Sequence, residues 1–553
     1  MHGARDRGQA VAPTGWLDAS ELRVGLGCMR LPTDEELALE TIAAAAEAGV
    51  TVFDTARAYG DNETLVARAL RRCGAEATAR IVTKGGMTRA GGGWIPDGRA
   101  KSIVADCEAS LAALDGLPID LYLIHAPDPR TPWRTSVRAL ARLADEGMVR
   151  RVGLSNVNRR QLDEALELAP VAGIQVALSP FDDRALRGGV VERCDELGIA
   201  LLAHSPLGGP KRAERIDAQE TLAWLLGLSR VVVPIPGARR PETARSAARV
   251  AAMSSVPAPL RRGHSRAPLR ADAEVVLVMG IPGAGKSRVA EEYVARGYLR
   301  LNRDERGGSL RELAGALDET LSSGSRRLVL DNTYLTRAAR NDVIEVAARH
   351  GISARCVWLD TPLAQAQVNL VERLLDRFGS LPTPGELWEL ARMEPGVLAP
   401  ASQMRALREL EPPSTDEGFA HVEHVPFVRT PSSGRTGVFV AARALAEPGW
   451  EKSIGDRDAP HLVYDWNPDD DETALDAAVA RLAAEVSGPV EGALCPHAAG
   501  PPTCWCRPPL PGLPLAFARA HGIDPSRSVL VGAGPAHKTL ATTLGARYVP
   551  VKP

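Results

Sequence analysis

Short apolar runs alternate with stretches of helical periodicity over residues 16–253. VTVFDTA, IDLYLIHA and VRRVGLSN are examples of the runs, and ETIAAAAEAG and VRALARLADEG of the helical stretches. Strict alternation of this kind predicts parallel β-strands joined by crossover helices. Seven runs from VTVFDTA to VVVPIPG, together with the earlier ELRVGLGCM, make eight expected strands. Eight is the strand number of a (β/α)8 TIM barrel, which is the fold we predict for this segment.

The alternation stops at residues 254–272 and then resumes. SSVPAPLRRGHSRAPLRAD is rich in Pro, Ser and Arg and has no periodicity, which predicts a linker. Its arginines could contact phosphates, but a solvated tether is the preferred interpretation. A second α/β segment covers residues 273–430, and TPSSGRTG predicts another short linker before a third α/β segment at residues 431–553. We therefore expect three α/β domains in line, without internal repeats.

Composition narrows the class of protein. The chain has 553 residues, 66 Lys and Arg against 68 Asp and Glu, and a net charge of −2, which excludes a globally polybasic coat for nucleic acid or membrane. Hydrophobic residues make up 45% and charged residues 24%, as in packed domains. Neither a transmembrane run nor the apolar core of a signal peptide is evident. Of eight cysteines, three stand in one short stretch with a histidine, so we expect a reducing cytoplasm and one metal site.

Polar residues follow the expected barrel strands, where (β/α)8 barrels carry their chemistry. Asp54 ends VTVFD and Tyr59 follows one loop later; Lys84 ends RIVTK and His125 ends DLYLIH. A lysine beside a phenol stabilises the phenolate and lowers the pKa of the tyrosine. Tyr59 would then be a general acid that delivers a proton while hydride arrives from elsewhere.

The phrases VFDTARAYG, IVTKGG, DLYLIHAPDP, GLSNV, SPLG and PIPGARRPE resemble the aldo-keto reductases over nearly the whole first segment. The resemblance implies NAD(P)H-dependent carbonyl reduction, with Tyr59 as proton donor tuned by Lys84 and Asp54, and with His125 orienting the carbonyl. It also implies that the nicotinamide carboxamide is held by Ser155, Asn156 and Gln175.

This segment departs from the family at the cofactor. His204 stands where the family stacks an aromatic ring on the nicotinamide, and its imidazole ring can still stack there, less well. Ser246 and Ala247 replace an acidic residue and an asparagine at the adenine end. Arg239 and Arg240 can meet a 2′-phosphate, which favours NADPH over NADH. The family's C-terminal specificity loop is missing before the linker, so the pocket is expected to be open, or closed by another domain. A barrel that binds cofactor without turnover stays an alternative.

The second segment opens with a phosphate-binding motif. GIPGAGKS fits G-x-x-x-x-G-K-S directly after the apolar run VVLVM, and its glycines are Gly280, Gly283 and Gly285. Backbone N–H groups at such a helix start cradle the phosphates of ATP. Lys286 is expected to reach the β- and γ-phosphates, and Ser287 to coordinate Mg²⁺.

Candidate residues for the phosphoryl acceptor come later. Asp304 in LNRDERGG could accept a proton from an acceptor hydroxyl. Asp331 ends the next strand in LVLDNT and is expected to contact the bound nucleotide cofactor. Arg373 and Arg377 lie one helical turn apart, as in a lid that closes on the transferring phosphate. Together with EPPSTDEGF, these motifs resemble the kinase module of polynucleotide kinase-phosphatases. The resemblance implies ATP-dependent phosphorylation of a 5′-hydroxyl on RNA or DNA, with Asp304 as base and Arg373 on the transferring phosphate. The same superfamily includes small-molecule and toxin kinases, so the acceptor stays open.

The third segment carries two close-spaced ligand pairs. CPHAAGPPTCWC supplies Cys495, His497, Cys504 and Cys506, a donor set suited to tetrahedral structural zinc. A redox pair is the alternative, but C-x-C matches C-x-x-C poorly.

The zinc loop and SVLVGAGPAHKTLATTLGA resemble the zinc-loop haloacid-dehalogenase phosphatases, which implies a HAD-like Rossmannoid fold. Those enzymes need a strand-end D-x-D, where this chain has Ala441 and Arg443. Pro508 stands at the lysine position, and Ala533 and His537 stand at acidic positions. Phosphoryl transfer has no chemical route without these groups, so we expect a pseudophosphatase.

Taken together, the motifs predict a nucleic-acid end-processing enzyme. It would join a 5′-hydroxyl polynucleotide kinase to an NADP(H)-binding reductase, with Mg²⁺ and Zn²⁺ as its metals and no membrane partner. The reductase substrate would be an aldehyde or ketone on a large molecule. Two alternatives are a metabolic small-molecule kinase-reductase, and a kinase regulated by an NADP(H)-sensing barrel.

Overall fold

The computed structural model describes residues 16–18, 20–90, 93–254, 273–428, 433–500 and 502–551. The chain divides into two compact units, Met1–Gly263 and His264–Pro553. The predicted linker at 254–272 lies outside the described residues apart from Ser254, as do residues 430–432 of the second predicted linker. The expected boundary near residue 430 therefore falls inside the second unit.

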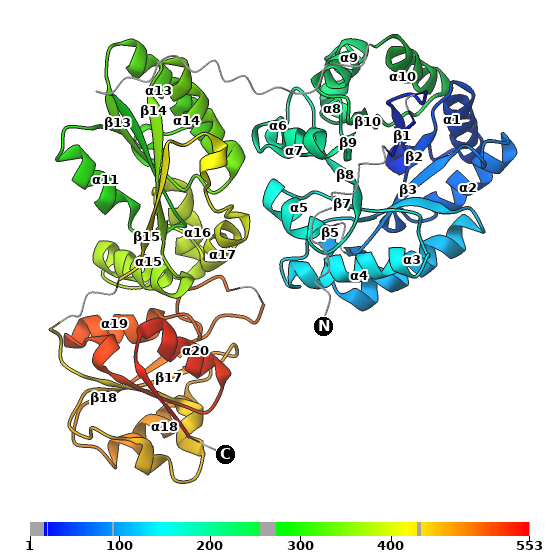
Figure 1. Cartoon of the computed structure of the whole chain (residues 1–553). Coiled ribbons are helices and arrows are strands. Elements are labelled where there is room, and N and C mark those ends of the chain that lie inside the picture. Colours follow the sequence, from blue (N-terminus) through cyan, green and yellow to red (C-terminus); the bar gives the residue numbers. More distant parts are fainter. Residues whose placement is uncertain are drawn as a thin grey trace, which may run out of the picture. The chain divides into compact units, whose positions relative to one another are not determined.

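The first unit is built on one eight-stranded parallel sheet (Figure 1). In sheet order, its strands are β1 (Gly25–Gly27), β2 (Val52–Asp54), β3 (Arg80–Gly85), β6 (Ile119–Ile124), β7 (Val152–Ser155), β8 (Val171–Ala177), β9 (Ala200–His204) and β10 (Val232–Pro234). The two edges meet where the N–H of Gly27 donates to the carbonyl of Pro236 at 3.0 Å. The predicted eight-stranded barrel is therefore confirmed, in nearly closed form.

Helices surround this barrel (Figure 1). They are α1 (Glu35–Glu47), α2 (Asn62–Arg72), α3 (Ala100–Leu114), α4 (Trp133–Asp145), α5 (Arg159–Leu166), α6 (Arg184–Arg187), α7 (Val190–Leu197), α8 (Pro210–Ala213), α9 (Ala218–Leu228) and α10 (Pro241–Met253). Local sequence sets several of their starts: the Asp34 side chain accepts from the N–H of Leu37 at α1, and Asn158 and Gln161 form a capping box at α5. A hairpin of β4 (Met87–Ala90) and β5 (Gly93–Pro96) follows β3.

Small residues let the barrel close around its apolar interior. A Cβ at Gly153 would lie 2.2 Å from the carbonyl oxygen of Gly173, so a side chain there would separate β7 from β8. The space above these glycines is filled by Leu121 and Leu123 from β6, both completely buried. The interior is thus packed, and chemistry is left to the strand ends.

The second unit contains two five-stranded parallel sheets. The first has the order β12 (Leu299–Leu301), β13 (Arg327–Asp331), β11 (Glu274–Met279), β14 (Ser353–Asp360) and β15 (His421–Pro426). Its helices are α11 (Lys286–Val294), α12 (Arg303–Arg306), α13 (Leu310–Ser322), α14 (Arg337–Arg349), α15 (Leu363–Phe378), α16 (Pro384–Met393) and α17 (Pro400–Glu409).

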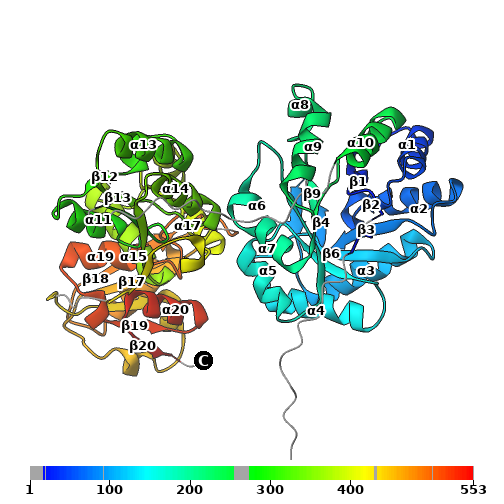
Figure 2. The same ribbon diagram turned by 45° about the horizontal axis from the view of Figure 1, so that its top comes forward.

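The other sheet has the order β18 (Val490–Cys495), β17 (His461–Trp466), β16 (Val438–Ala441), β19 (Val529–Gly532) and β20 (Arg547–Pro550). Its helices are α18 (Thr473–Ala483), α19 (Gly512–His521) and α20 (Pro535–Leu544). α15 packs against α19 and α20, and Figure 2 shows α15 beside α19 as Figure 1 does. One hydrophobic cluster runs from α15 into this second sheet, so α15 shares the core of the C-terminal sheet.

Among the described residues, none of the helices combines the length and the apolar character needed to cross a membrane.

Candidate functional sites

The carboxyl ends of β2, β3 and β6 bring four predicted residues together. The completely buried Nζ of Lys84 donates to Asp54 Oδ1 and to the carbonyl of Thr55, each at 2.7 Å. It lies 5.2 Å from the centroid of the Tyr59 ring. The rings of Tyr59 and His125 meet edge to face at 5.7 Å. A cation, a carboxylate, a phenol and an imidazole thus share one site.

Burial dominates the protonation of this site. It raises the pKa of Tyr59 although Lys84 acts in the opposite direction, so the expected lowering of that pKa is wrong in net direction. Burial also opposes the charge of Lys84, but Asp54 and Tyr59 outweigh it and the pKa of Lys84 is raised. Burial, with Lys84 and His204, lowers the pKa of His125 to about 3. At neutral pH the site therefore holds a protonated phenol, an ammonium and a neutral imidazole.

Asn156 connects the residues expected at the nicotinamide. Its Nδ2 donates to the carbonyl of His125 at 3.0 Å and to Ser155 Oγ at 3.1 Å. Its Oδ1 lies 3.1 Å from Nε2 of His204. Ser155 itself is buried beneath the site, whereas Asn156 and His204 line the cavity described below.

Gln175 takes part in a contact that the sequence does not reveal. Its Nε2 donates to Asp54 Oδ1 at 2.6 Å, so the amide nitrogen already has a protein acceptor. Gln175 still lines the cavity, and its placement there remains compatible with a polar ligand. It also restrains the carboxylate that pairs with Lys84.

These residues face a cavity of about 720 Å³, lined among others by Tyr59, Trp94, His125 and Arg239. Trp94 was not among the expected site residues, yet its ring lies 5.9 Å from that of Tyr59 and 5.8 Å from that of His125. The sequence signal for Trp94 is a tryptophan directly after a run of glycines, in the segment that follows the strand of Lys84. Arg240 does not line this cavity; it is the N-cap residue of α10.

A smaller cavity of about 60 Å³ adjoins the first. Ser246 and Ala247 line it, and Leu207, Pro236 and Gly237 line both cavities. The positions expected at the adenine end of a cofactor are therefore continuous with the mouth of the barrel.

The predicted phosphate-binding loop lies between β11 and α11. A Cβ at Gly283 would meet the carbonyl oxygen of Ala366 at 2.3 Å, and the backbone φ of Gly285 is +92°. Both positions require glycine, one for space and one for backbone conformation. Ser287 is exposed in the first turn of α11.

Lys286 is the electrostatic centre of this site. Its Nζ donates to the carbonyls of Gly280 and Ile281 at 3.1 and 3.0 Å. Burial and then Arg373 lower its pKa to about 8, while Asp331 and Asp304 act in the opposite direction. Arg373 and the two carboxylates therefore each act electrostatically on Lys286.

The two carboxylates differ in their surroundings. Asp331 is buried, and both its oxygens accept from Arg300, at 2.8 and 2.7 Å. The carboxylate of Asp331, which was expected to contact the cofactor, is therefore already paired with Arg300. Asp304 is 46% exposed, with its neighbour Arg303 at 3.2 Å. Asp304 is thus the more accessible of the two for an acceptor hydroxyl.

The EPPSTDEGF motif forms part of a buried ionic network. Arg340 is completely buried and donates to both oxygens of Glu417 at 2.7 Å. Arg337 pairs with Asp416 at 2.8 Å, and its N–H donates to Glu411 at 2.8 Å. The carboxylates of this motif anchor the segment to α14, which is a structural role.

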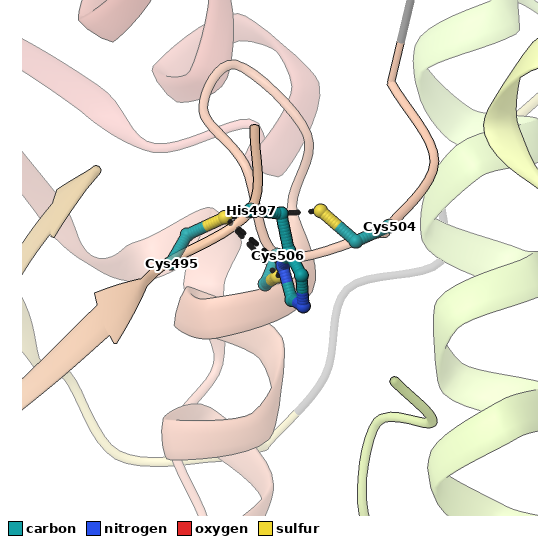
Figure 3. A group of neighbouring side chains, drawn as sticks. All are labelled: Cys495, His497, Cys504 and Cys506. Atoms are coloured by element: carbon teal, nitrogen blue, oxygen red, sulfur yellow. Dashed lines mark hydrogen bonds between the residues drawn. The ribbon is translucent and has the colours of Figure 1, made fainter. Parts of the chain in front are cut away.

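The third segment brings four potential metal ligands together, as Figure 3 shows. They are Cys495, His497, Cys504 and Cys506, and their ligand atoms all lie within 4.8 Å of one another. The Sγ of Cys495 lies 3.7 Å from that of Cys504 and 3.3 Å from that of Cys506. Nδ1 of His497 lies 3.1 Å from the Sγ of Cys506 and 3.5 Å from that of Cys495. Tetrahedral zinc with Zn–S bonds of about 2.3 Å would separate two sulfurs by about 3.8 Å. The donor set and its spacing fit zinc.

In the β16–β20 sheet, the positions where a haloacid-dehalogenase phosphatase would carry aspartates hold other residues. Ala441 ends the central strand β16, and Arg443 is exposed immediately after it. Nδ1 of His537 accepts from the N–H of Ala533 at 3.1 Å. Burial lowers the pKa of His537, against the nearby Asp465. Pro508 supplies no cation at its position.

Comparisons with known proteins identify two segments. The Aldo/keto reductase family profile matches residues 23–220, and an AAA domain profile matches residues 275–393. Aldo-keto reductase str7 of Strobilurus tenacellus is 37% identical over 167 residues, 30% of this chain and 48% of that protein. Probable aldo-keto reductase 1 of Glycine max is 32% identical over 269 residues, 39% of this chain and 76% of that protein. The glycerol dehydrogenase AKR11B4 structure from Gluconobacter oxydans is 26% identical, with a TM-score of 0.39, and covers 44% of this chain and 91% of its own.

Proposed function

Through residues 23–220 this chain belongs to the aldo/keto reductase family, and from that membership we propose that its barrel reduces carbonyl compounds with NADP(H). The observation that carries the proposal is the buried Lys84–Asp54 pair beneath Tyr59 and His125, at the floor of a 720 Å³ cavity. The amide and imidazole groups of Asn156 and His204 suit the polar face of a nicotinamide.

Carbonyl reduction requires a hydride and a proton. Ser155, Asn156 and Gln175 would hold the nicotinamide of NADPH, which would supply a hydride to the carbonyl carbon and so leave negative charge on the carbonyl oxygen. Tyr59 gives its phenolic proton to that oxygen, and Lys84 stabilises the phenolate that remains. His125, whose ring contacts that of Tyr59, orients the carbonyl. Its lowered pKa keeps it neutral, so it does not compete with Tyr59 as an acid. The exposed Arg239 would meet a 2′-phosphate, which favours NADPH.

For the second unit we propose ATP-dependent phosphorylation of a nucleic-acid 5′-hydroxyl. The AAA domain match supports a nucleotide-binding P-loop, and Lys286 lies within electrostatic range of Asp304 and Arg373. Asp304 accepts the proton of the attacking hydroxyl, whose oxygen bonds to the γ-phosphorus as the bond to the β-phosphate oxygen breaks. Lys286 and Arg373 stabilise the charge on the transferring group. Ser287, exposed in the first turn of α11, would hold Mg²⁺.

The last segment is proposed to be a phosphatase-like domain that binds structural zinc and has lost catalysis. The four converging ligands support zinc. Ala441 and Arg443 leave the nucleophile and acid positions without carboxylates, and Ala533 and His537 do the same at the positions of the acidic Mg²⁺ ligands. Mg²⁺-dependent release of phosphate from 3′-phosphorylated ends, abolished by substitutions in this segment alone, would contradict this assignment.

Two assays test the activities. Label transfer from [γ-³²P]ATP to a 5′-hydroxyl oligonucleotide, against a panel of hydroxylated metabolites, tests the acceptor. NADPH oxidation with aldehyde-bearing oligonucleotides, against small aldehydes, tests the carbonyl substrate. Transfer to metabolites only would replace the nucleic-acid proposal with a metabolic kinase. Tight NADPH binding without oxidation of any aldehyde would leave a sensing role for the barrel.

A further inference from the structure

α15 lies against the phosphate-binding loop on one side. The carbonyl of its residue Ala366 occupies the space beside Gly283. Asn369, one turn later, donates from Nδ2 to the carbonyl of Gly283 at 2.7 Å, and Gln365 donates to Asn369 Oδ1 at 2.8 Å. The position of α15 therefore determines where the loop lies.

The same helix is held by the C-terminal sheet on its other side. Its buried residues Val371, Leu374 and Leu375 belong to one cluster with residues of α19 and α20. Arg519 of α19 forms an ion pair with Asp376 of α15. The C-terminal segment thus completes the core that seats this helix.

A second route joins the cysteine cluster to the same loop. Trp505 stands between the ligands Cys504 and Cys506, is 2% exposed, and donates from Nε1 to the carbonyl of Leu398 at 2.9 Å. Leu398 lies just before α17. In α17 the completely buried Gln403 donates from Nε2 to the carbonyl of Pro282 in the phosphate-binding loop at 3.0 Å.

The cysteine cluster also touches the segment between α15 and α16. Leu381 packs against the cluster of Cys495, Cys504 and Cys506. A Cβ at Gly512 would lie 2.8 Å from Leu381 Cδ1, so the contact is close and leaves no space for a side chain. The cysteine cluster and the segment between α15 and α16 are therefore neighbours, although about a hundred residues separate them along the chain.

We propose that the four-ligand cluster is a positioning element of the kinase: filled with metal, it holds Trp505, which fixes α17 and thereby the phosphate-binding loop. Trp505 and Gln403 are positioning residues in this scheme, since each acts through the backbone of another residue, Leu398 or Pro282. The inference rests on the proposed ATP-binding function of the loop. It gives the inactive phosphatase-like segment a reason to be retained.

The test compares two tryptophans beside the same cluster in the full chain. Trp505→Phe keeps an aromatic ring but removes the hydrogen bond to Leu398. Trp466→Phe is the matched control, because the Trp466 Nε1 donates to the carbonyl of the ligand His497 at 2.8 Å and its ring lies beside Arg507, both within the C-terminal segment. Loss of one buried hydrogen bond corresponds to about a fivefold change in an equilibrium constant. For each variant we would measure the equilibrium binding of a fluorescent ATP analogue, the zinc content by elemental analysis, and the KM and kcat for ATP.

We expect Trp505→Phe to retain zinc and to raise both the Kd and the KM for ATP about fivefold, with Trp466→Phe like wild type. Gln403→Leu should reproduce the loss in ATP affinity with zinc unchanged. The double variant Trp505→Phe/Gln403→Leu should lose no more than either single variant, because both act on one connection.

Wild-type ATP affinity in Trp505→Phe, or additive losses in the double variant, would overturn the positioning role while leaving the kinase proposal intact. Absence of ATP binding by wild type would overturn both. Metal removal is a second arm: chelation should weaken ATP-analogue binding, and unchanged binding by zinc-free protein would overturn the inference. The control is hydrogen exchange: if peptides from β11 and α11 stay protected in the zinc-free protein, the sheet that carries the phosphate-binding loop has remained folded.

Discussion

Lys84→Met tests the buried ion pair on which the proposed reductase site depends. Lys84 is completely buried and donates to Asp54 and to the carbonyl of Thr55, each at 2.7 Å. The substitution conserves volume but leaves the Asp54 carboxylate buried with Gln175 as its remaining donor in the described network. Removing one partner of a buried pair destabilises a protein by about 3–5 kcal/mol. We expect a loss of this size in the free energy of unfolding of the barrel.

The assay is hydrogen exchange of β2 and β3 peptides in the full chain across a denaturant series, which reports this unit apart from the other. The double variant Asp54→Asn/Lys84→Met is the control, because the asparagine side chain would keep an acceptor for Gln175 without a buried charge. It should recover more than half of the loss. A loss below about 1 kcal/mol in the single variant, or no recovery in the double variant, would refute the assignment of a charged pair.

The pH dependence of the pair has a definite sign. The pKa of Lys84 is raised above its ordinary value of 10.5. Its contribution to stability is therefore complete below pH 10.5 and is lost as the pH rises through the higher value of the folded state. Lys84→Met should remove this alkaline part of the stability profile.

Four further predictions concern individual residues. Tyr59→Phe should slow NADPH oxidation by about 10²–10⁴-fold with NADPH affinity unchanged, because a general acid is removed; a fully active variant in a steady-state assay would contradict the proton-donor role. Lys286→Ala should weaken ATP binding by calorimetry, whereas Asp304→Asn should bind ATP but transfer no label, and label transfer by the latter would exclude Asp304 as base. Cys504→Ser should lower the zinc-to-protein ratio in elemental analysis, and an undiminished ratio would exclude it as a ligand. Because the pKa of His125 is lowered to about 3, the unfolded chain takes up the proton first, and barrel stability should fall as the pH drops from 6.5 toward 3. His125→Gln should flatten this pH dependence in thermal unfolding, and an unchanged pH dependence would assign it to other titratable groups.

The sequence by itself determined the elements whose signals are local. Alternating strands and helices specify the eight-stranded barrel because each strand buries both faces and each helix one stripe. The order G-x-x-x-x-G-K-S places a phosphate-binding loop because the spacing of its glycines is a backbone requirement. Four candidate metal ligands within a dozen residues could also be recognised, since a short loop brings them together.

Only the tertiary structure decided which distant groups meet. The pairing of Gln175 with Asp54 joins β8 to β2, and that of Arg300 with Asp331 joins β12 to β13. The net pKa of Tyr59 depends on burial, which sequence spacing does not report. The shared core of α15 with the C-terminal sheet follows from long-range packing of apolar faces, because hydrophobic burial is non-directional and the linear pattern does not name its partner. Short-range sequence patterns therefore identify the individual candidate sites. The charge states of their residues, and the contacts between the phosphate-binding loop and the cysteine cluster, follow from three-dimensional packing.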